Sequence, residues 1–120
     1  MQLYPRLNEG IYCFVSLPIG DTSPKEALLT FQEQEGTTII IEKTLAKQYG
    51  YIYAFPSAWI TLTTETGLTM TGITATFSKI LSDNAISCNV VAAFHHDHIF
   101  VPVDKKDQAI MLLKSIHIDM

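Results

Sequence analysis

Two short segments of this sequence carry side chains that could do chemistry. The stretch from Thr66 to Gly72 is rich in hydroxyl groups and glycine, and it runs into the apolar residue Ile73. The second segment is His95-His96-Asp97-His98. Free backbone N–H groups at the start of a helix favour an anion such as a carboxylate, whereas imidazole and carboxylate groups can hold a metal ion or transfer protons. The two segments therefore suggest two different kinds of site.

The first segment leads into a predicted helix. Apolar residues recur after Gly72 with helical spacing, which predicts an amphipathic helix that begins at Ile73. Thr71 is expected to cap this helix with its hydroxyl, and Gly72 to let the backbone pass close to a bound group. An anion site at the helix N-terminus would involve five consecutive residues, Thr69, Met70, Thr71, Gly72 and Ile73. Many strand-to-helix turns look like this, so an ordinary capped loop fits the same residues.

The histidine cluster is expected to belong to a β-hairpin. Side chains alternate along a strand, so His96 and His98 point one way while His95 and Asp97 point the other, and at most one pair can readily share a metal ion. We therefore expect no metal site, but a turn in which Asp97 binds local backbone and one or more histidines line a ligand pocket. His117 would join the cluster only if the C-terminal end of the chain folds back.

The rest of the sequence offers no familiar catalytic or cofactor-binding motif. It contains no Walker loop, no nucleophile elbow, no Cys-x-x-Cys pair and no helical His-x-x-x-His pair. Glu33, Glu35 and Glu42 flank a predicted hairpin and are typical of solvated charges rather than of a catalytic acid and base. We expect no catalytic residues and no cofactor.

The second half of the chain must position both segments, and its pattern predicts a β-α-β-β-α order of elements. Alternating apolar residues at 58–63 predict an inner strand, and the helix from Ile73 follows. Alternation returns at 88–95 and at 99–103, so two more strands are expected, joined at His96-Asp97.

The end of the chain completes this pattern. Pro102 places the last predicted strand at a sheet edge or marks its outer end. Asp104 is expected to cap a final helix that buries Ala109, Leu112, Leu113 and Ile116. The order is that of the ferredoxin-like split βαβ arrangement, an α+β fold, but its fourth strand is missing. The first half of the chain is therefore expected to supply strand partners.

The first half is predicted to be mostly strand. Residues 11–17 form an apolar run, and residues 29–33 and 37–41 fit a hairpin better than a helix starting near Ser23. A short helix at 43–49 is expected to end at Gly50. With residues 51–57 as the link, the sequence suggests a strand-rich lobe at 1–56 and a second lobe at 57–120.

The stretch from Trp59 through Asn89 and Val90 resembles the ACT domain, a small regulatory module that binds amino acids. The pattern from Leu29 to Val103 is similar to that of small bacterial tandem ACT-like proteins of unassigned function. The segments that carry the resemblance are Thr37 to Glu42, Gly72-Ile73-Thr74, Ile86 to Val90 and His96 to Val101.

This resemblance implies an amino-acid ligand held between the turn at Thr69 to Ile73 and neighbouring strands. It adds Asn89 and Val90 to the predicted site, with His95 as a further polar group. Two positions depart from the general ACT pattern. Thr71 stands where a proline commonly precedes the turn glycine, and Ala85 stands where a glycine often precedes the second strand.

Composition narrows the classes of partner. Of the 120 residues, 48% are hydrophobic and 17% charged, which is more apolar surface than a small monomer readily hides, so a homodimer is expected. The net charge of −4 and the single arginine, Arg6, argue against nucleic acid as a partner. The sequence also has no polybasic segment that would bind a membrane surface. No signal peptide is evident, so we expect a cytoplasmic protein in which Cys13 and Cys88 are buried free thiols.

The function that these features predict is that of a non-enzymatic, amino-acid-binding regulatory module. Two alternatives remain open at this point. One is a pure dimerisation or assembly module without a small ligand, and the other is a small metal-dependent enzyme that uses the cluster from His95 to His98.

Overall fold

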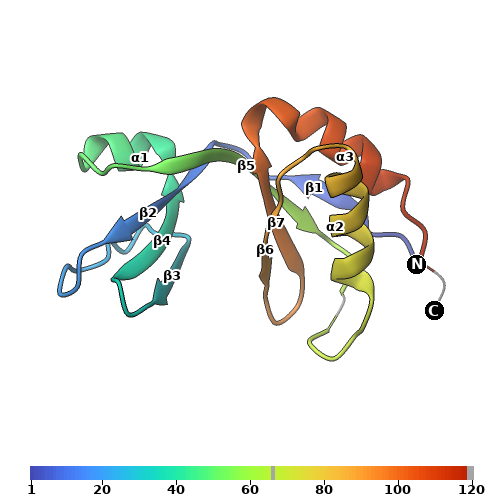
Figure 1. Cartoon of the computed structure of the whole chain (residues 1–120), viewed down its shortest axis with the longest axis horizontal. Coiled ribbons are helices and arrows are strands. Elements are labelled where there is room, and N and C mark those ends of the chain that lie inside the picture. Colours follow the sequence, from blue (N-terminus) through green and yellow to red (C-terminus); the bar gives the residue numbers. More distant parts are fainter. Residues whose placement is uncertain (66, 119–120) are drawn as a thin grey trace. The chain divides into compact units, whose positions relative to one another are not determined.

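A computed structural model describes residues 1–65 and 67–118 of the chain. The chain divides into two compact units, one made of Gly10–Ser57 and the other of Met1–Glu9 together with Ala58–Met120 (Figure 1). The first nine residues thus group with the second half of the sequence. Among the described residues, no helix is long and apolar enough to cross a membrane.

The unit at Gly10–Ser57 is a small antiparallel sheet with one helix. Its strands are adjacent in the order β3-β4-β2-β5, where β5 contributes only its first residues. The core is formed mainly by alternate residues of β2 and β4, such as Val15 and Ile39, with Ala46 of the helix packed on them. The elements are β2 (Tyr12–Leu17), β3 (Leu29–Gln32), β4 (Thr37–Glu42), α1 (Lys43–Gln48) and β5 (Ala54–Leu62).

Most of the sequence predictions for this unit are confirmed. The β3–β4 hairpin forms, and α1 ends before Gly50, which has the left-handed backbone expected of it, with φ of 73°. Strand β5 begins at Ala54, within the segment 51–57 that was expected to link the two lobes. Within this strand Ser57 pairs with Tyr12, is fully buried, and donates its hydroxyl to the Tyr12 carbonyl oxygen at 2.9 Å.

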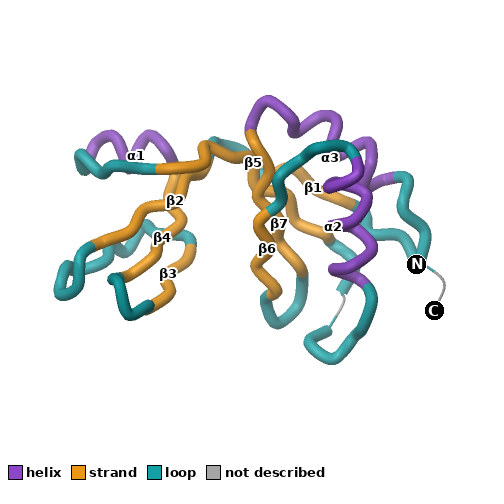
Figure 2. Tube along the Cα trace, viewed as in Figure 1, coloured by secondary structure: helices purple, strands orange, loops and turns teal. Residues whose placement is uncertain are grey.

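The other unit is a sheet covered by two helices that pack on each other (Figure 2). Its strands are adjacent in the order β1-β5-β7-β6, and both helices bury their apolar sides against β5 and β7. The core includes Ile60, Phe77, Ile99 and Leu113, none of which is exposed. The elements are β1 (Pro5–Leu7), β5 (Ala54–Leu62), α2 (Ile73–Asp83), β6 (Asn89–Ala92), β7 (Asp97–Pro102), the 3-10 helix η1 (Val103–Lys105) and α3 (Lys106–Lys114).

The missing fourth strand of the ferredoxin-like arrangement is β1, from the N-terminus. It pairs antiparallel with β5, with Pro5 opposite Leu62 and Leu7 opposite Ile60. The N-terminus is held in place as well, because the Met1 amino group donates to the Ile118 carbonyl oxygen at 2.6 Å. The prediction that the first half of the chain supplies strand partners is confirmed, and the α+β ferredoxin-like fold is that of the structure.

Three local predictions for this unit are wrong. Thr71 does not cap α2, because the N-cap residue is Gly72, with φ of 85° and no side-chain cap. Asp104 does not cap α3 either, since it lies in η1 and Lys105 precedes the α-helix. The β6–β7 hairpin turns two residues earlier than His96-Asp97, with Ala93 N–H bonded to the His96 carbonyl oxygen, so Asp97 begins β7. Pro102 ends β7, as expected.

The two cysteines are free thiols, as predicted. Cys13 is fully buried and Cys88 is half-buried. Burial raises the pKa of both thiols, that of Cys88 to about 11. Both therefore remain protonated and unreactive near neutral pH.

Candidate ligand-binding site

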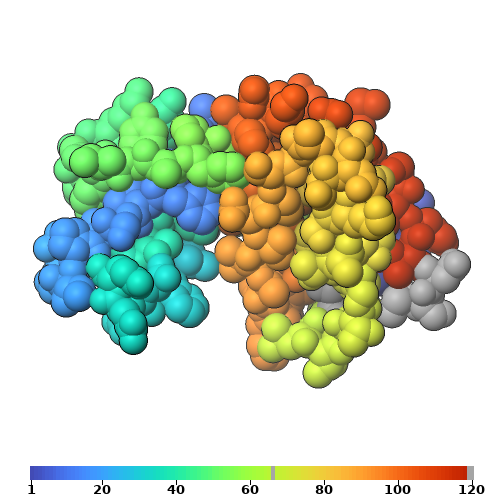
Figure 3. All heavy atoms as spheres, in the orientation of Figure 1, coloured from blue at the N-terminus to red at the C-terminus, as the bar shows by residue number. Residues whose placement is uncertain are grey.

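A small cavity of about 90 Å³ lies where the loop before α2 meets the β6–β7 hairpin. In Figure 3 the atoms of the loop (yellow-green) and of the hairpin tip (orange) lie together at one end of this unit. Both polar and apolar groups line the cavity. Its walls come from Gly67, Leu68, Met70, Ile73, Thr74, Ala92, Ala93 and Asp97.

Two glycines shape the loop that forms one wall. Gly67 and Gly72 have φ values of 64° and 85°, a left-handed conformation that glycine adopts at little cost. The first backbone hydrogen bond of α2 runs from Thr76 N–H to the Gly72 carbonyl oxygen at 3.0 Å. The N–H groups of Ile73, Thr74 and Ala75 precede it, at the helix end where the dipole favours an anion.

Asp97 brings a carboxylate to the opposite wall. Its side chain lies on the helix-covered side of the sheet, because it alternates along β7 with the core residues Ile99 and Val101 and pairs across the hairpin with Ala92. Only 7% of Asp97 is exposed. Aspartate is rarely buried to this degree unless its charge is partnered, so the carboxylate belongs to an organised polar environment.

The structure separates the residues that the sequence had grouped into one site. Met70 and Ile73 line the cavity, and Gly72 shapes its loop. Thr69 and Thr71 are exposed neighbours that do not form the walls, and Thr66 lies outside the described residues.

Asn89 and Val90, which the family resemblance added, and the polar residue His95 lie elsewhere. Val90 packs against the hydrophobic core, and Asn89 pairs with Phe100 on the face of β6 that points away from the helices. His95 is exposed in the turn of the same hairpin that supplies Ala92 to the cavity. The sequence prediction missed the cavity-lining residues Thr74, Ala92, Ala93 and Asp97.

Comparison with known proteins agrees with this architecture. Family models described as ACT domain match residues 1–58 and residues 55–115. The chain belongs to the ACT domain family. The two ACT matches overlap at residues 55–58, within β5, the strand that contributes to both structural units. The predicted resemblance to tandem ACT-like proteins is confirmed.

Two solved structures are similar to this ACT protein. One is a protein of unknown function from Vibrio cholerae, called a possible transport protein. It has 33% identity and a TM-score of 0.88, and the match covers 98% of this chain and 92% of that one. The other, from Agrobacterium tumefaciens, has 19% identity and a TM-score of 0.80, covers 94% and 87% of the two chains, and shows the fold alone. No curated protein sequence matches the chain.

The histidine cluster is distributed over three environments in this ACT protein. His95 lies 3.5 Å from a carboxylate oxygen of Glu65, but both side chains are mostly exposed, so the pair contributes little. The Nδ1 atom of His96 is buried and finds no hydrogen-bond partner among the described residues. No group of three potential metal ligands comes together in residues 1–65 and 67–118.

His98 belongs to a hydrogen-bonded network on the helix-free face of the sheet. Its Nδ1 atom lies 3.0 Å from the Trp59 indole nitrogen and 3.0 Å from the Thr61 hydroxyl, which in turn accepts a 2.9 Å bond from Asn8. Indole N–H can only donate, so Nδ1 is the acceptor and the neutral ring carries its proton on Nε2. Burial lowers the pKa of His98, and the charges of His96 and Arg6 lower it further, against the opposing effect of Asp97.

Arg6 is fixed more firmly than its position near the N-terminus suggested. It lies in β1 opposite Thr61, so the sheet anchors the backbone that carries its side chain. The signal that could have shown this is the need of the ferredoxin-like sheet for a fourth strand. Arg6 therefore contributes a positive charge to the His98 face rather than to the cavity.

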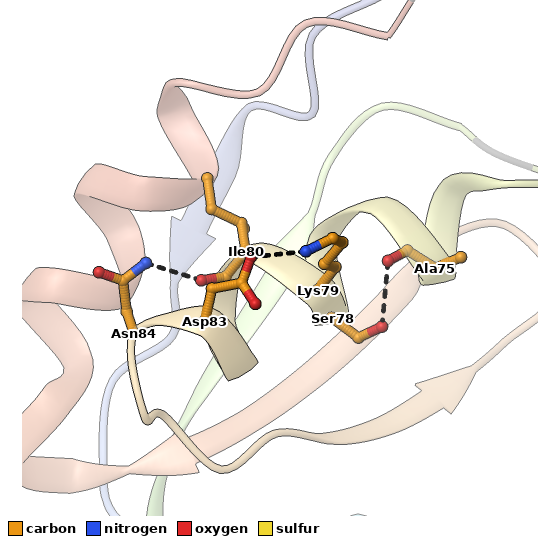
Figure 4. A network of polar contacts seen from close by, with 6 residues as sticks. All are labelled: Ala75, Ser78, Lys79, Ile80, Asp83 and Asn84. Carbon is orange, nitrogen blue, oxygen red and sulfur yellow. Dashed lines mark hydrogen bonds and ion pairs between the residues drawn. The ribbon is translucent and has the colours of Figure 1, made fainter.

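Two larger hollows are surface features rather than sites. One of about 350 Å³ is lined by Gln2, Tyr4, Pro5 and Lys114, and one of about 360 Å³ runs along the outer side of α2, and neither has a buried charged side chain among its described lining residues. On α2 the polar groups already bind one another (Figure 4), because Lys79 pairs with Asp83 at 2.8 Å and Asn84 donates to the Ile80 carbonyl oxygen at 2.8 Å. The smaller cavity is the one with a buried carboxylate.

Proposed function

We propose that this ACT protein is a non-catalytic regulatory module that binds a free amino acid in the cavity between the loop at Gly67–Thr74 and the β6–β7 hairpin. ACT domains commonly bind small molecules such as amino acids, and they typically regulate rather than catalyse. We also propose that its two modules are residues 1–56 and 57–120. In this division β1, from the first module, pairs with β5 in the sheet of the second module, and the first residues of β5 pair with β2 in the sheet of the first.

The observation that carries this proposal is the pairing of opposite polarities across the cavity. The Asp97 carboxylate suits the ammonium group of an amino acid, while the N-terminus of α2 and the Thr74 hydroxyl suit its carboxylate. Both polar ends of a zwitterion would meet complementary groups. The apolar walls at Met70 and Ile73 would face its side chain.

Regulation would follow from linkage between ligand binding and the position of the loop. The ligand would touch the loop on one side and the hairpin on the other, so it would favour the arrangement in which both walls are close. A ligand can shift such an equilibrium only by the difference in its affinity for the two arrangements.

Thermal unfolding of the whole chain tests the proposal. A ligand present at 100 times its dissociation constant stabilises the folded state by about 2.7 kcal/mol. For the unit that holds the cavity, the melting temperature should rise by roughly 10–20 °C. Each common amino acid is screened at millimolar concentration. Asp97→Asn should abolish the response, because it keeps the shape of the side chain and removes its charge.

The control is Asp21→Asn, the same substitution at an exposed loop position of the other unit, which should respond normally. If Asp97→Asn lowers the melting temperature but still responds, Asp97 supports the turn and does not bind the ligand. If no amino acid changes the melting temperature, the alternative of a pure assembly module without a small ligand is preferred. Strand β6 forms a sheet edge that can pair with a second copy of the chain. Light scattering of the same samples tests for the homodimer that we propose.

A further inference from the structure

The size of the cavity limits what it can hold. At about 90 Å³ it lies well below the roughly 300–1,000 Å³ of pockets for drug-sized ligands. On the same measure a single water needs about 10–15 Å³, so the cavity has the capacity of several waters. An amino acid that places both of its charged groups inside leaves little of this space for its side chain.

The residues that line the cavity differ in how firmly the surrounding structure holds their side chains. Ile73 is 3% exposed and packs in the first turn of α2 against the hydrophobic core, which fixes it. Ala92 and Ala93 bring backbone and methyl groups of the hairpin. Met70 is only partly buried and flexible, and it packs on the same core from the loop. Met70 and the more exposed Leu68 are the loop side chains whose truncation would enlarge the cavity without disturbing a helix or a strand, and Met70 is the one of the two that packs on the core.

We propose that this cavity selects amino acids with side chains no larger than those of alanine and serine, and that Met70 sets this limit. The inference rests on the proposed function, because it assumes an amino acid whose ammonium group lies at Asp97 and whose carboxylate lies at the N-terminus of α2. In that orientation the side chain of the ligand points toward Met70 and Ile73. A branched side chain meets both and is excluded.

Two ligand series and two variants test the proposal. Glycine, alanine and serine are compared with valine, leucine and phenylalanine by calorimetric titration of the full chain. The unaltered protein should bind the small set at least tenfold more tightly. Met70→Ala should narrow this ratio to less than threefold by gaining affinity for valine and leucine. Met111→Ala, the same change at a methionine of α3 that is 73% exposed, should leave the ratio unchanged.

The failures of the two proposals can be told apart. If leucine or phenylalanine binds the unaltered protein as well as alanine, the size limit is wrong while the amino-acid site stands. The same holds if Met70→Ala binds ligand with its original selectivity. If no amino acid of either series binds, the proposed function itself fails, and the size limit with it. Should Met70→Ala not fold, Met70→Val provides a smaller enlargement with the same expected direction.

Discussion

At the scale of single residues, the sequence predicted part of the cavity and missed the residue that gives it charge. Met70 and Ile73 were included in the prediction because they belong to the five-residue turn around Gly72, and both line the cavity. Asp97 was predicted to lie in the turn, because the apolar alternation of the following strand is evident only from Ile99. Its true place could have been found by extending the alternation of Ile99 and Val101 back by two residues. Adjacent polar residues had concealed the start of the strand.

His98 should make stability depend on pH. Its pKa is lowered in the folded protein, whereas the ordinary value for histidine is about 6.5. The unfolded chain therefore binds a proton more readily, so the stabilisation is complete above about pH 6.5 and is lost as pH falls toward the folded-state pKa. Urea unfolding followed by the fluorescence of Trp59, the single tryptophan, should give a lower free energy of unfolding at pH 5.5 than at pH 7.5.

Substitution identifies His98 as the source. His98→Phe removes the acceptor that Trp59 and Thr61 share, so it should cost about 1–3 kcal/mol at pH 7.5 and reduce the pH dependence. His95→Phe, at an exposed turn position, should change stability by less than about 0.5 kcal/mol and keep the pH dependence. An undiminished pH dependence in His98→Phe would assign the effect to another group.

At the scale of elements, hydrophobic periodicity succeeded where the core decides the structure. The apolar stripe of α2 and the predicted strands at β2 and β4 place apolar residues in the two cores. Predictions failed at the ends of elements. Thr71 has the right chemistry for a cap, yet the left-handed Gly72 takes the N-cap position and directs the chain differently. Such ends depend on the path of the neighbouring loop, which periodicity does not contain.

The C-terminal end of α2 explains one departure from the ACT pattern and yields a prediction. Ala85 adopts φ of 59°, and the helix ends in a Schellman motif, with Ile86 N–H bonded to the Leu81 carbonyl oxygen and Ala85 N–H to that of Ser82. An alanine in this conformation costs roughly 1–2 kcal/mol. Ala85→Gly should raise the free energy of unfolding by about 0.5–1 kcal/mol, after the greater flexibility of glycine in the unfolded chain is subtracted.

In the matched control, the expected change in the free energy of unfolding has the opposite sign. Ala75→Gly makes the same substitution at an exposed position inside α2, where it should lower stability by up to about 1 kcal/mol. Chemical denaturation of both variants decides the matter. Destabilisation by Ala85→Gly would mean that the left-handed alanine carries no strain.

At the scale of the whole molecule, the two structural units are not consecutive halves of the sequence. The family matches divide the chain into consecutive halves, whereas the contacts group residues 1–9 with the second half. The sequence indicated a missing fourth strand, but nothing in the short segment Pro5–Leu7 marks it as that strand. A strand of three residues has too little pattern to be recognised without its partner.

Because residues 1–9 belong to the unit formed mainly by the C-terminal half, a substitution near the N-terminus should destabilise that unit. Leu3 is fully buried in the core of that unit, so Leu3→Ala should cost about 2–5 kcal/mol. Leu7→Ala, in β1 but 41% exposed, should cost much less. Native-state hydrogen exchange shows where the loss falls, because each amide reports the local free energy of opening. Amides of β5, β7 and α3 should lose protection in Leu3→Ala while those of β2 and β4 keep theirs. Equal losses in both sets would mean that the two units unfold together and that the N-terminal segment supports the entire chain.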